Sequence, residues 1–563
     1  MGMFGRVDWK PDEPREADIA WRMSLTGPQA VPELAGRPFV EKPPLTYWLA
    51  GAAISQAGTS PWIARLPNLL YALVFAAAVG MLAKVAASGR LAVVAVITGS
   101  SFFLTYQVAI WLATDAALIA CVAASLLGMH LGYRATSVRE RLLGYSLMHL
   151  ALALGFLAKS AGAWVVPVAA FAALIVWEKR YRELLRWELY AGLVVQAAII
   201  TPWLLSLASR PGGADLLENA LWLNIAGRMA HLGGHAAHLP QYADAHRNSF
   251  GKYFIEAPFY VMPWTFLVIA AARRGWHELR SRGERAAAWR FATAATIPGL
   301  LVLSIAATGR GIYAAPSLIG VALAIALWYE KAASAPDAFD LCMLRASSFV
   351  VAGIALVMLL LLPVAAIFYS HTHSNTAGLI LGAMLMGAAV TWLLRSLREA
   401  ARSRDVTRAL GVLFASYSAI LIGFGAAYFP AINYEQDLRP VTSALRNDLH
   451  GRQLVLLAPD ETTEAVVDMQ GIPSRTIDWS AGRTNDAASI RDNECVLAMS
   501  KLTIGPVYDL MRRYGIKSQS PRDAADIGSF AAALGLRVER DYTVPDGRHY
   551  VLLGRQHDSA LPQ

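Results

Sequence analysis

Long apolar runs separated by short polar links dominate the first three quarters of the chain. Each run is roughly 17 to 25 residues long, the length at which a helix crosses about 30 Å of hydrocarbon. Because a segment in hydrocarbon must satisfy its backbone hydrogen bonds internally, we expect these runs to be helices. Twelve membrane spans are predicted, at residues 62–86, 90–111, 113–133, 141–160, 162–178, 185–207, 254–273, 289–308, 311–329, 346–369, 376–395 and 408–429.

The pattern changes in the last quarter of the chain, where charged residues return. Short β-type runs at 453–458, 495–499 and 550–553 alternate there with helical stretches such as 524–534. This alternation predicts a small α/β domain over 431–563. Because the segment has neither a glycine-rich phosphate loop nor metal-ligand spacing, its simplest interpretation is a structural or partner-binding cap.

Composition agrees with a polytopic α-helical membrane protein. Of the 563 residues, 56% are hydrophobic and 16% are charged, whereas an average soluble domain has about a quarter charged residues. Three cysteines, Cys121, Cys342 and Cys495, are too few and too dispersed for a disulfide framework, so we expect no bridge.

The formal net charge of +9 relates to membrane topology, because the basic residues concentrate in alternate links. The basic links lie at 134–141, 179–186, 273–290 and 395–408. The other short links carry little positive charge besides Lys159 and Arg310. The positive-inside rule places the basic links in the cytoplasm. Residues 1–61, the 208–253 loop and the segment 431–563 are therefore expected outside the cytoplasm.

Export of the first 61 residues requires a preceding span, yet no signal peptide or apolar segment precedes them. We therefore expect a first transmembrane helix upstream of Met1. An in-frame apolar segment in the upstream DNA would support it, and a verified start at Met1 in a functional protein would exclude it.

Ionisable residues gather on the predicted outer face. Asp115 begins one span, Lys159 ends another, and Arg310 lies in a turn between two more. An interfacial cation is often only a snorkelling anchor, and Asp12 could simply cap a helix over 12–23. Carboxylates and cations from four separated segments on one side nevertheless favour a shared site, because ionisable groups at membrane depth are costly.

An ordered set of motifs extends over most of residues 10–330. The motifs are Asp12-Glu13-x-Arg15, Glu41-Lys42-Pro43-Pro44-Leu45-x-Tyr47-Trp48, Trp62-x-Ala64-Arg65-Leu66-Pro67, Thr114-Asp115, Phe156-Leu157-Ala158-Lys159, Pro263-Trp264 and Tyr313-x-x-Pro316. Together they resemble glycosyltransferase family 39, and within it the bacterial transferases that attach aminoarabinose to lipid A. The Glu-Lys-Pro-Pro-Leu string with its upstream Asp-Glu is the specific part of the match.

The resemblance implies a GT-C fold of thirteen transmembrane helices, which is the twelve predicted here plus the missing first one, and a periplasmic C-terminal domain. The chain would then divide into a catalytic membrane domain over 1–430, with periplasmic loops at 1–61 and 208–253, and a periplasmic α/β domain over 431–563. The implied reaction, at the periplasmic face of the bacterial inner membrane, moves a sugar from undecaprenyl phosphate to an acceptor. Aminoarabinose and a lipid A phosphate are the leading pair.

Site residues carry over from the matched motifs. The expected catalytic residues are Asp12, Asp115 and Glu41. The expected ligands of the donor phosphate are Lys42, Lys159 and Arg310, because charge that develops on a leaving phosphate needs clustered cations. Substrate contacts are expected from Glu13, Arg15, Tyr313, Arg228 and His231.

A divalent metal is a further expectation, with Glu41 as a ligand beside histidines of the 208–253 loop, since carboxylate and imidazole both bind zinc. The loop histidines are His231, His235, His238 and His246. Their spacing matches no defined metal site, and histidines of an exported loop are more often simply solvated.

Three positions depart from the family pattern. Glu16 and Phe39 stand where relatives commonly have tyrosine, and Arg310 begins a turn that often begins with lysine. The loss of two hydroxyls and the gain of a carboxylate change which partner can bind.

Two alternative functions stay open. One is a polyprenyl-phosphate-hexose (mannose) transferase acting on protein Ser/Thr or an envelope glycan, whose hydroxyl acceptor would need Asp12 or Asp115 as general base. The other is a lipid-sugar flippase. The sequence gives no sign of an inverted repeat or of paired broken helices, which argues against the flippase.

Overall fold

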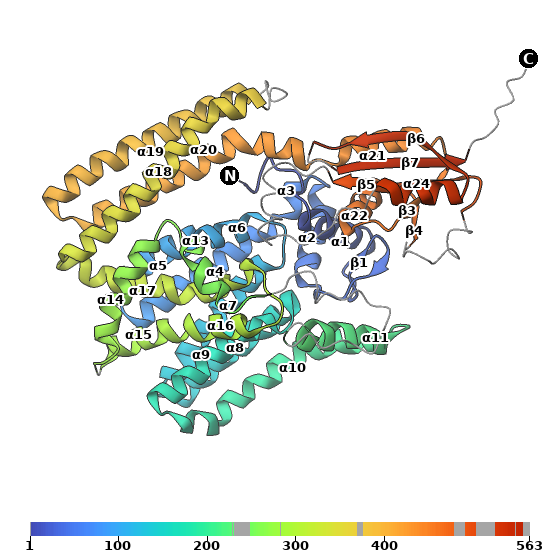
Figure 1. Ribbon diagram of the computed structural model, residues 1–563. Coiled ribbons are helices and arrows are strands. Elements are labelled where there is room, and N and C mark those ends of the chain that lie inside the picture. The colour runs from blue at the N-terminus through green and yellow to red at the C-terminus, as the bar shows by residue number, and fades with distance from the viewer. Residues whose placement is uncertain are drawn as a thin grey trace, which may run out of the picture.

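The computed structural model describes residues 2–227, 229, 248–281, 283–368, 375–477, 490–502, 524–545 and 548–555. Helices form a large bundle, and a small β-sheet lies beyond one end of it (Figure 1). The N-terminal helices α1 to α3 lie between the bundle and the sheet, and α18 to α20 form a slab along one side of the bundle (Figure 1).

Nine helical segments among the described residues are long and apolar enough to cross a membrane. They are Pro61–Ala86 (α3, Pro61–Ala64, and α4, Pro67–Ala86), Asp115–Arg134 (α7), Val138–Lys159 (α8), Trp187–Ala208 (α10), Glu284–Ile305 (α15, Glu284–Ala294, and α16, Ile297–Ile305), Gly311–Ser334 (η3, Gly311–Ser317, and α17, Leu318–Ser334), Ala338–Pro363 (within α18, Ala338–Phe368), Thr376–Ser396 (within α19, Thr376–Ser403) and Val406–Asp448 (α20, Val406–Gln436, and α21, Arg439–Asp448). A tenth predicted segment forms the shorter apolar helix α9, Gly162–Glu178. The links contain η1 (Tyr181–Leu185), α11 (Gly213–Leu217) and η2 (Glu218–Gly227).

Two predicted spans are bent, each into two helices. Residues 90–111 form α5 (Gly89–Ser101) and α6 (Phe103–Ile110), which meet at 69°, and residues 254–273 fall in α13 (Lys252–Tyr260) and α14 (Thr265–Glu278), which meet at 114°. The second break contains Pro263, which lacks a backbone N–H donor. A backbone hydrogen bond joins the two breaks: the Phe103 N–H donates to the Met262 carbonyl at 2.9 Å. The chain therefore contains two bent helix pairs that the sequence patterns did not predict.

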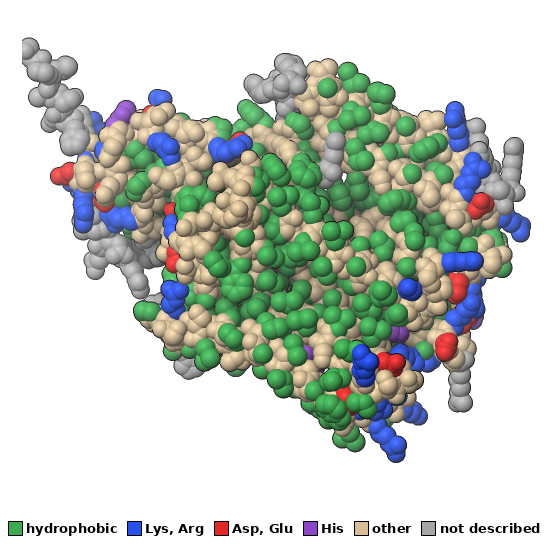
Figure 2. Space-filling view, turned by 180° about the vertical axis from the view of Figure 1, so that it is seen from behind, with side chains coloured by type: hydrophobic (Ala, Val, Ile, Leu, Met, Phe, Trp, Pro, Cys, Tyr) green, Lys and Arg blue, Asp and Glu red, His purple; other side chains and the backbone are tan. Residues whose placement is uncertain are grey.

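The outer surface of the bundle is strongly apolar. Figure 2 shows hydrophobic side chains over the broad middle of one face, with most charged side chains toward its edges. Apolar side chains of three spans are largely exposed: Leu73 (69% exposed), Val194 (71%) and Leu360 (66%). Contiguous apolar surface on this scale would not stay in water, so it fits a lipid-facing belt.

The segment before the first span folds against the bundle. It consists of α1 (Asp12–Thr26), the short antiparallel strands β1 (Glu33–Leu34) and β2 (Arg37–Pro38), and α2 (Leu45–Ala57). The helix predicted from Asp12 is confirmed, and α1 packs along α2. Asp12 is not its N-cap, because Pro11 holds that position and the cap has no side-chain bond. The Asp12 carboxylate therefore serves a different contact.

The C-terminal segment forms a five-stranded sheet in the order β4-β3-β5-β7-β6. Its elements are β3 (Gln453–Leu457), α22 (Glu461–Met469), β4 (Ser474–Ile477), β5 (Glu494–Leu502), α24 (Ala524–Ala533), β6 (Leu536–Thr543) and β7 (Arg548–Arg555). Strand β3 is parallel to β4 and β5, whereas β7 is antiparallel to β5 and β6. The predicted strands and helix of this segment are confirmed. Helix α22 connects β3 to β4 and also packs on α1.

Candidate active site

The first turn of α1 is joined to the turn before η3 by an ion pair between Asp12 and Arg310. The Arg310 guanidinium donates from Nη1 to Asp12 Oδ1 at 3.2 Å and from Nη2 to Oδ2. One helical turn further along, Arg15 Nη2 lies 3.4 Å from the same Oδ1 atom. The Asp12 side chain is only 14% exposed, so its negative charge is neutralised by protein cations and little by water.

A second pair joins the end of α8 to the start of α7, which pack side by side. The Lys159 ammonium donates to Asp115 Oδ1, and it lies 4.7 Å from the centre of the Tyr313 ring. Tyr313 and Asp115 both act electrostatically on Arg310. This pair therefore adjoins the Asp12–Arg310 pair, and the predicted residues of three distant segments meet.

The third pair brings Lys42, from the loop before α2, onto Glu16 of α1. Tyr47 Oη donates to Glu16 Oε2 at 2.6 Å, and Arg15 Nη2 donates to Glu16 Oε1 at 3.2 Å. Glu16 is 1% exposed. Glu41 lies near enough for its charge to act on Arg15. The carboxylate that departs from the family pattern is thus a buried anchor for two cations of the site.

The cations hold the Asp12 and Glu16 carboxylates in the ionised form. Burial would raise the pKa of Asp12, but the hydrogen bond and charge of Arg310 outweigh it, and the charges of neighbouring Lys42 and Arg15 add to this, so the pKa lies well below its usual range. The pKa of Glu16 is lowered too, because Lys42 and Arg15 overcome the effect of burial. A general base works best with a pKa near the working pH, so Asp12 is poorly suited to remove a proton.

Glu13 does not fit its predicted contact with substrate. Its side chain is fully buried. Its oxygens accept hydrogen bonds from Arg6 Nη2 (2.8 Å), Arg65 Nε (3.0 Å), the Leu112 N–H (2.8 Å) and the Trp9 N–H (2.8 Å). Because these donors use both oxygens, Glu13 anchors the first loop to α3 and to the link before α7.

Two predicted substrate contacts, Arg228 and His231, lie outside the described residues, as do the other loop histidines. Among the residues that the structure describes, no group of three or more His, Cys, Asp or Glu is arranged to hold a metal ion. The metal role of Glu41 stays a prediction.

Helix α22 presents an acidic face to α1, a contact that no sequence motif predicted. Glu461 Oε2 lies 2.6 Å from Arg15 Nη1, and Thr462 Oγ1 donates to the Pro11 carbonyl at 3.1 Å. Asp468 Oδ2 accepts from Arg22 Nε at 2.6 Å. The C-terminal segment therefore binds the helix that carries Asp12. The available signal was the spacing of Glu461, Glu464 and Asp468, which places three acids on one helical face.

Asp18 lies within this interface between α1 and α22. Its Oδ2 atom accepts from the Ala35 N–H at 2.8 Å and lies 4.0 Å from Arg22 Nε. Burial and the nearby Asp468 carboxylate raise the pKa of Asp18 to about 9. The raised pKa favours the protonated form of Asp18, which lessens the repulsion between two carboxylates at the interface.

Comparison with known proteins agrees with the motif resemblance. Residues 41–205 match the family model described as dolichyl-phosphate-mannose-protein mannosyltransferase. The undecaprenyl phosphate-alpha-4-amino-4-deoxy-L-arabinose arabinosyl transferase of Serratia proteamaculans is 27% identical over 339 residues, which cover 59% of this chain and 57% of that protein. Its counterpart in Edwardsiella ictaluri is 29% identical over 285 residues, 50% of this chain and 48% of that protein. The chain thus spans about half the length of the curated relatives it matches.

The fold is shared over a much longer stretch. The crystal structure of ArnT from Cupriavidus metallidurans bound to undecaprenyl phosphate superposes with a TM-score of 0.67 at 16% identity, covering 100% of this chain and 96% of that one. The apo form of the same protein gives a TM-score of 0.66 at 17% identity, with the same coverage. The predicted resemblance and the predicted GT-C fold are confirmed.

Proposed function

We propose that this chain is a membrane glycosyltransferase that moves aminoarabinose from undecaprenyl phosphate to a phosphate of lipid A. The observation that carries the proposal is the cluster of three acid–base pairs, Asp12–Arg310, Asp115–Lys159 and Glu16–Lys42, assembled from four separated segments. The relatives named above are transferases of this sugar by name, and the shared fold supports the same reaction here.

In this reaction the bond between the anomeric carbon and the donor phosphate oxygen breaks, and the phosphate leaves with the electron pair. Negative charge grows on its oxygens in the transition state. Lys42, Lys159 and Arg310 are placed to stabilise that charge, each on a buried or half-buried carboxylate that fixes its position. The acceptor oxygen forms the new bond on the opposite side of the anomeric carbon.

The low pKa of Asp12 bears on the acceptor. A hydroxyl nucleophile needs a base to take its proton, whereas a phosphate oxygen is already ionised at neutral pH. Asp12 is bound by Arg310 and stays ionised, so it suits stabilisation of positive charge on the sugar ring better than proton removal. This favours a phosphate acceptor over a protein Ser/Thr.

The hexose alternative keeps one observation in its favour. The family model that matches residues 41–205 is described by a mannosyl transfer to protein, not by transfer to lipid A. In that reaction a carboxylate with a pKa near neutrality would have to serve as base. The flippase alternative draws no support from the broken helices, because the residues at the breaks are apolar and the ionisable cluster lies elsewhere.

We propose twelve membrane spans, with the cluster and the C-terminal sheet on the periplasmic side of the bacterial inner membrane. The basic links support this orientation: Arg134 and Arg290, from two of them, both bind Glu178, at 3.1 and 3.0 Å. The catalytic membrane domain would cover 1–430 and the periplasmic domain 431–563.

The proposal is tested with the purified full chain in lipid nanodiscs, supplied with undecaprenyl-phosphate aminoarabinose and lipid A. We expect aminoarabinosylated lipid A, and no product from the Asp12→Asn variant. Product from a mannose donor and a Ser/Thr peptide, with none from the first pair, would select the hexose alternative.

A further inference from the structure

A cavity of about 180 Å³ lies behind α1, on the side away from the three acid–base pairs. Pro14, Ala17 and Trp21 line it, and their spacing places them on one face of the helix. Asp12 and Glu16 lie on the opposite face by the same period. The remaining walls come from the N-terminal segment before α1, the turn between α2 and α3, the joint between α20 and α21, and α22.

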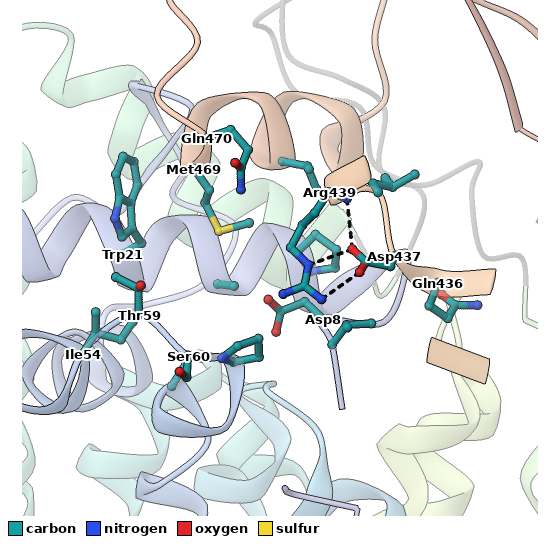
Figure 3. Close-up of a pocket in the computed structure, with 17 residues that line it drawn as sticks. Asp8, Trp21, Ile54, Thr59, Ser60, Gln436, Asp437, Arg439, Met469 and Gln470 are labelled. Carbon is teal, nitrogen blue, oxygen red and sulfur yellow. Dashed lines mark hydrogen bonds and ion pairs between the residues drawn. The ribbon is translucent and has the colours of Figure 1, made fainter. Parts of the chain in front are cut away.

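The cavity has one aromatic and apolar side and one polar side. In Figure 3, Trp21 and Ile54 stand on one side, Asp8, Asp437 and Arg439 stand on the other, and Gln470 reaches in from above. The hydroxyl-bearing residues Thr59 and Ser60 lie along the lower edge (Figure 3).

The charges in this cavity are already paired. Arg439 donates from Nε and Nη2 to the two oxygens of Asp437 at 2.8 and 2.7 Å, and Asp8 Oδ1 accepts from Arg65 Nη2 at 3.1 Å. An ionic ligand would compete with these pairs, whereas a neutral ligand need not. The cavity therefore does not select for a charged molecule.

Several neutral polar side chains that line the cavity, by contrast, are able to form further hydrogen bonds. Within the described part of the chain, the side chains of half-buried Trp21 and Gln470 and of solvent-exposed Thr59 and Ser60 make no hydrogen bond to other protein groups. They offer an indole N–H, two hydroxyls and an amide, so both donors and acceptors face the cavity. A hydrocarbon ligand would bury these groups without partners, which is unfavourable.

We infer that this cavity is a subsite for one neutral sugar ring. A sugar ring presents an apolar C–H face, which can stack on the Trp21 indole, and a rim of hydroxyls that both donate and accept. Its size also fits: about 180 Å³ is smaller than the roughly 300–1,000 Å³ of drug-sized pockets, so it suits a single ring and excludes a lipid chain. The inference concerns binding alone and does not depend on the proposed transfer reaction.

A sugar in this position contacts α1, the α20–α21 joint and α22 together. It would therefore stabilise the placement of the C-terminal sheet against the helix that carries Asp12. The ring can come from a free monosaccharide or from a residue of an envelope glycan, since both present the same face and hydroxyls.

Saturation-transfer NMR on the full chain in detergent micelles tests the inference, with a panel of glucose, galactose, mannose, N-acetylglucosamine and a core oligosaccharide freed from lipopolysaccharide. We expect saturable binding of at least one sugar. Trp21→Leu should weaken it roughly tenfold, the effect of losing about 1.4 kcal/mol of contact. Gln470→Ala should weaken sugar binding several-fold. If Trp21→Leu does not fold, Gln470→Ala is the variant that tests the inference. Binding of the oligosaccharide but of no monosaccharide would identify a glycan as the source.

The matched control is Trp177→Leu, which removes a half-exposed tryptophan of α9 and should leave binding unchanged. The inference is overturned if no sugar of the panel binds, or if Gln470→Ala and any folded Trp21→Leu bind as the wild type does. Binding that is lost in Asp12→Asn and retained in Gln470→Ala would place the sugar at the catalytic cluster, which would also overturn it.

Discussion

The carboxylate of Asp12 and the guanidinium of Arg310 form a two-bond ion pair across 298 residues of sequence, with Nη1 at 3.2 Å from Oδ1. The pair fixes the first turn of α1 against the turn that begins η3. It also lowers the pKa of Asp12 and holds Arg310 in one place. This contact therefore favours the ionised form of the candidate catalytic carboxylate and fixes the position of a candidate phosphate ligand.

Replacing Asp12 by asparagine should abolish transfer, by about 10² fold or more, because a preorganised charge at the reacting centre is lost. Transfer is measured with purified protein, and expression is compared by immunoblot. Asp215→Asn, an exposed acid of α11, is the control and should keep full activity. Full activity in Asp12→Asn would remove Asp12 from the mechanism.

The pH profile should depend on Arg310. Burial opposes ionisation of Asp12, and Arg310 supplies the main compensation that lowers its pKa, so wild-type activity should have no Asp12-controlled fall between about pH 5 and 8. In Arg310→Ala the pKa of Asp12 rises, and the remaining activity should fall as the pH is lowered through this range. Arg310→Lys keeps the charge but loses the two-bond geometry, so its pH profile should lie between those of the wild type and Arg310→Ala. Identical profiles in all three proteins would contradict the pairing.

Glu16→Gln should destabilise the protein, although the glutamine side chain has nearly the same size as the glutamate. Glu16 is the buried partner of Lys42 and Arg15, and its removal leaves Lys42 without that partner at a site where it is 12% exposed. Loss of one member of a buried ion pair typically costs about 3 kcal/mol, so the unfolding temperature in detergent should fall by several degrees. Glu16→Asp keeps the charge and should retain more of the stability. A Glu16→Gln protein as stable as the wild type would show that the anchor is dispensable.

The membrane helices and the gathering of Asp12, Asp115, Lys159 and Arg310 in one place followed from local sequence. Span length, apolar composition and basic links are set by the surrounding lipid and need no long-range information. Residues such as Asp115 and Lys159 could be assigned to one face because each sits at a span end. The breaks after Ser101 and at Pro263 could not be predicted, since each is stabilised by the other through the Phe103–Met262 hydrogen bond.

The contribution of α22 to the site was also beyond the sequence. Its acids resemble an ordinary solvated helix face, and Glu461 meets Arg15 only because the sheet folds back over α1 across 446 residues. Glu13 is a second residue whose contacts could not be predicted from the sequence. It stands beside Asp12 in the motif, but the turn of the helix points its side chain toward Arg6 and Arg65.

The interface between α1 and α22 should weaken at alkaline pH. The pKa of Asp18 is raised by burial and by Asp468 to about 9, from an ordinary value of 3.8. Between these values the folded state binds one more proton than the unfolded state, so stability falls as the pH rises. Unfolding temperatures at pH 6, 7.5 and 9 should therefore decline less in Asp18→Asn than in the wild type. Equal slopes, with Asp215→Asn as the reference variant, would contradict this.

Mass spectrometry of lipid A tests the central claim most directly. Lipid A is extracted from matched cells with and without the gene, in a strain known to make undecaprenyl-phosphate aminoarabinose. We predict a gene-dependent addition of the mass of one aminoarabinose, absent when Asp12→Asn or Lys42→Ala replaces the wild type. Unchanged lipid A in cells that express the protein would contradict the proposed substrate pair and move the search to glycoproteins and envelope glycans.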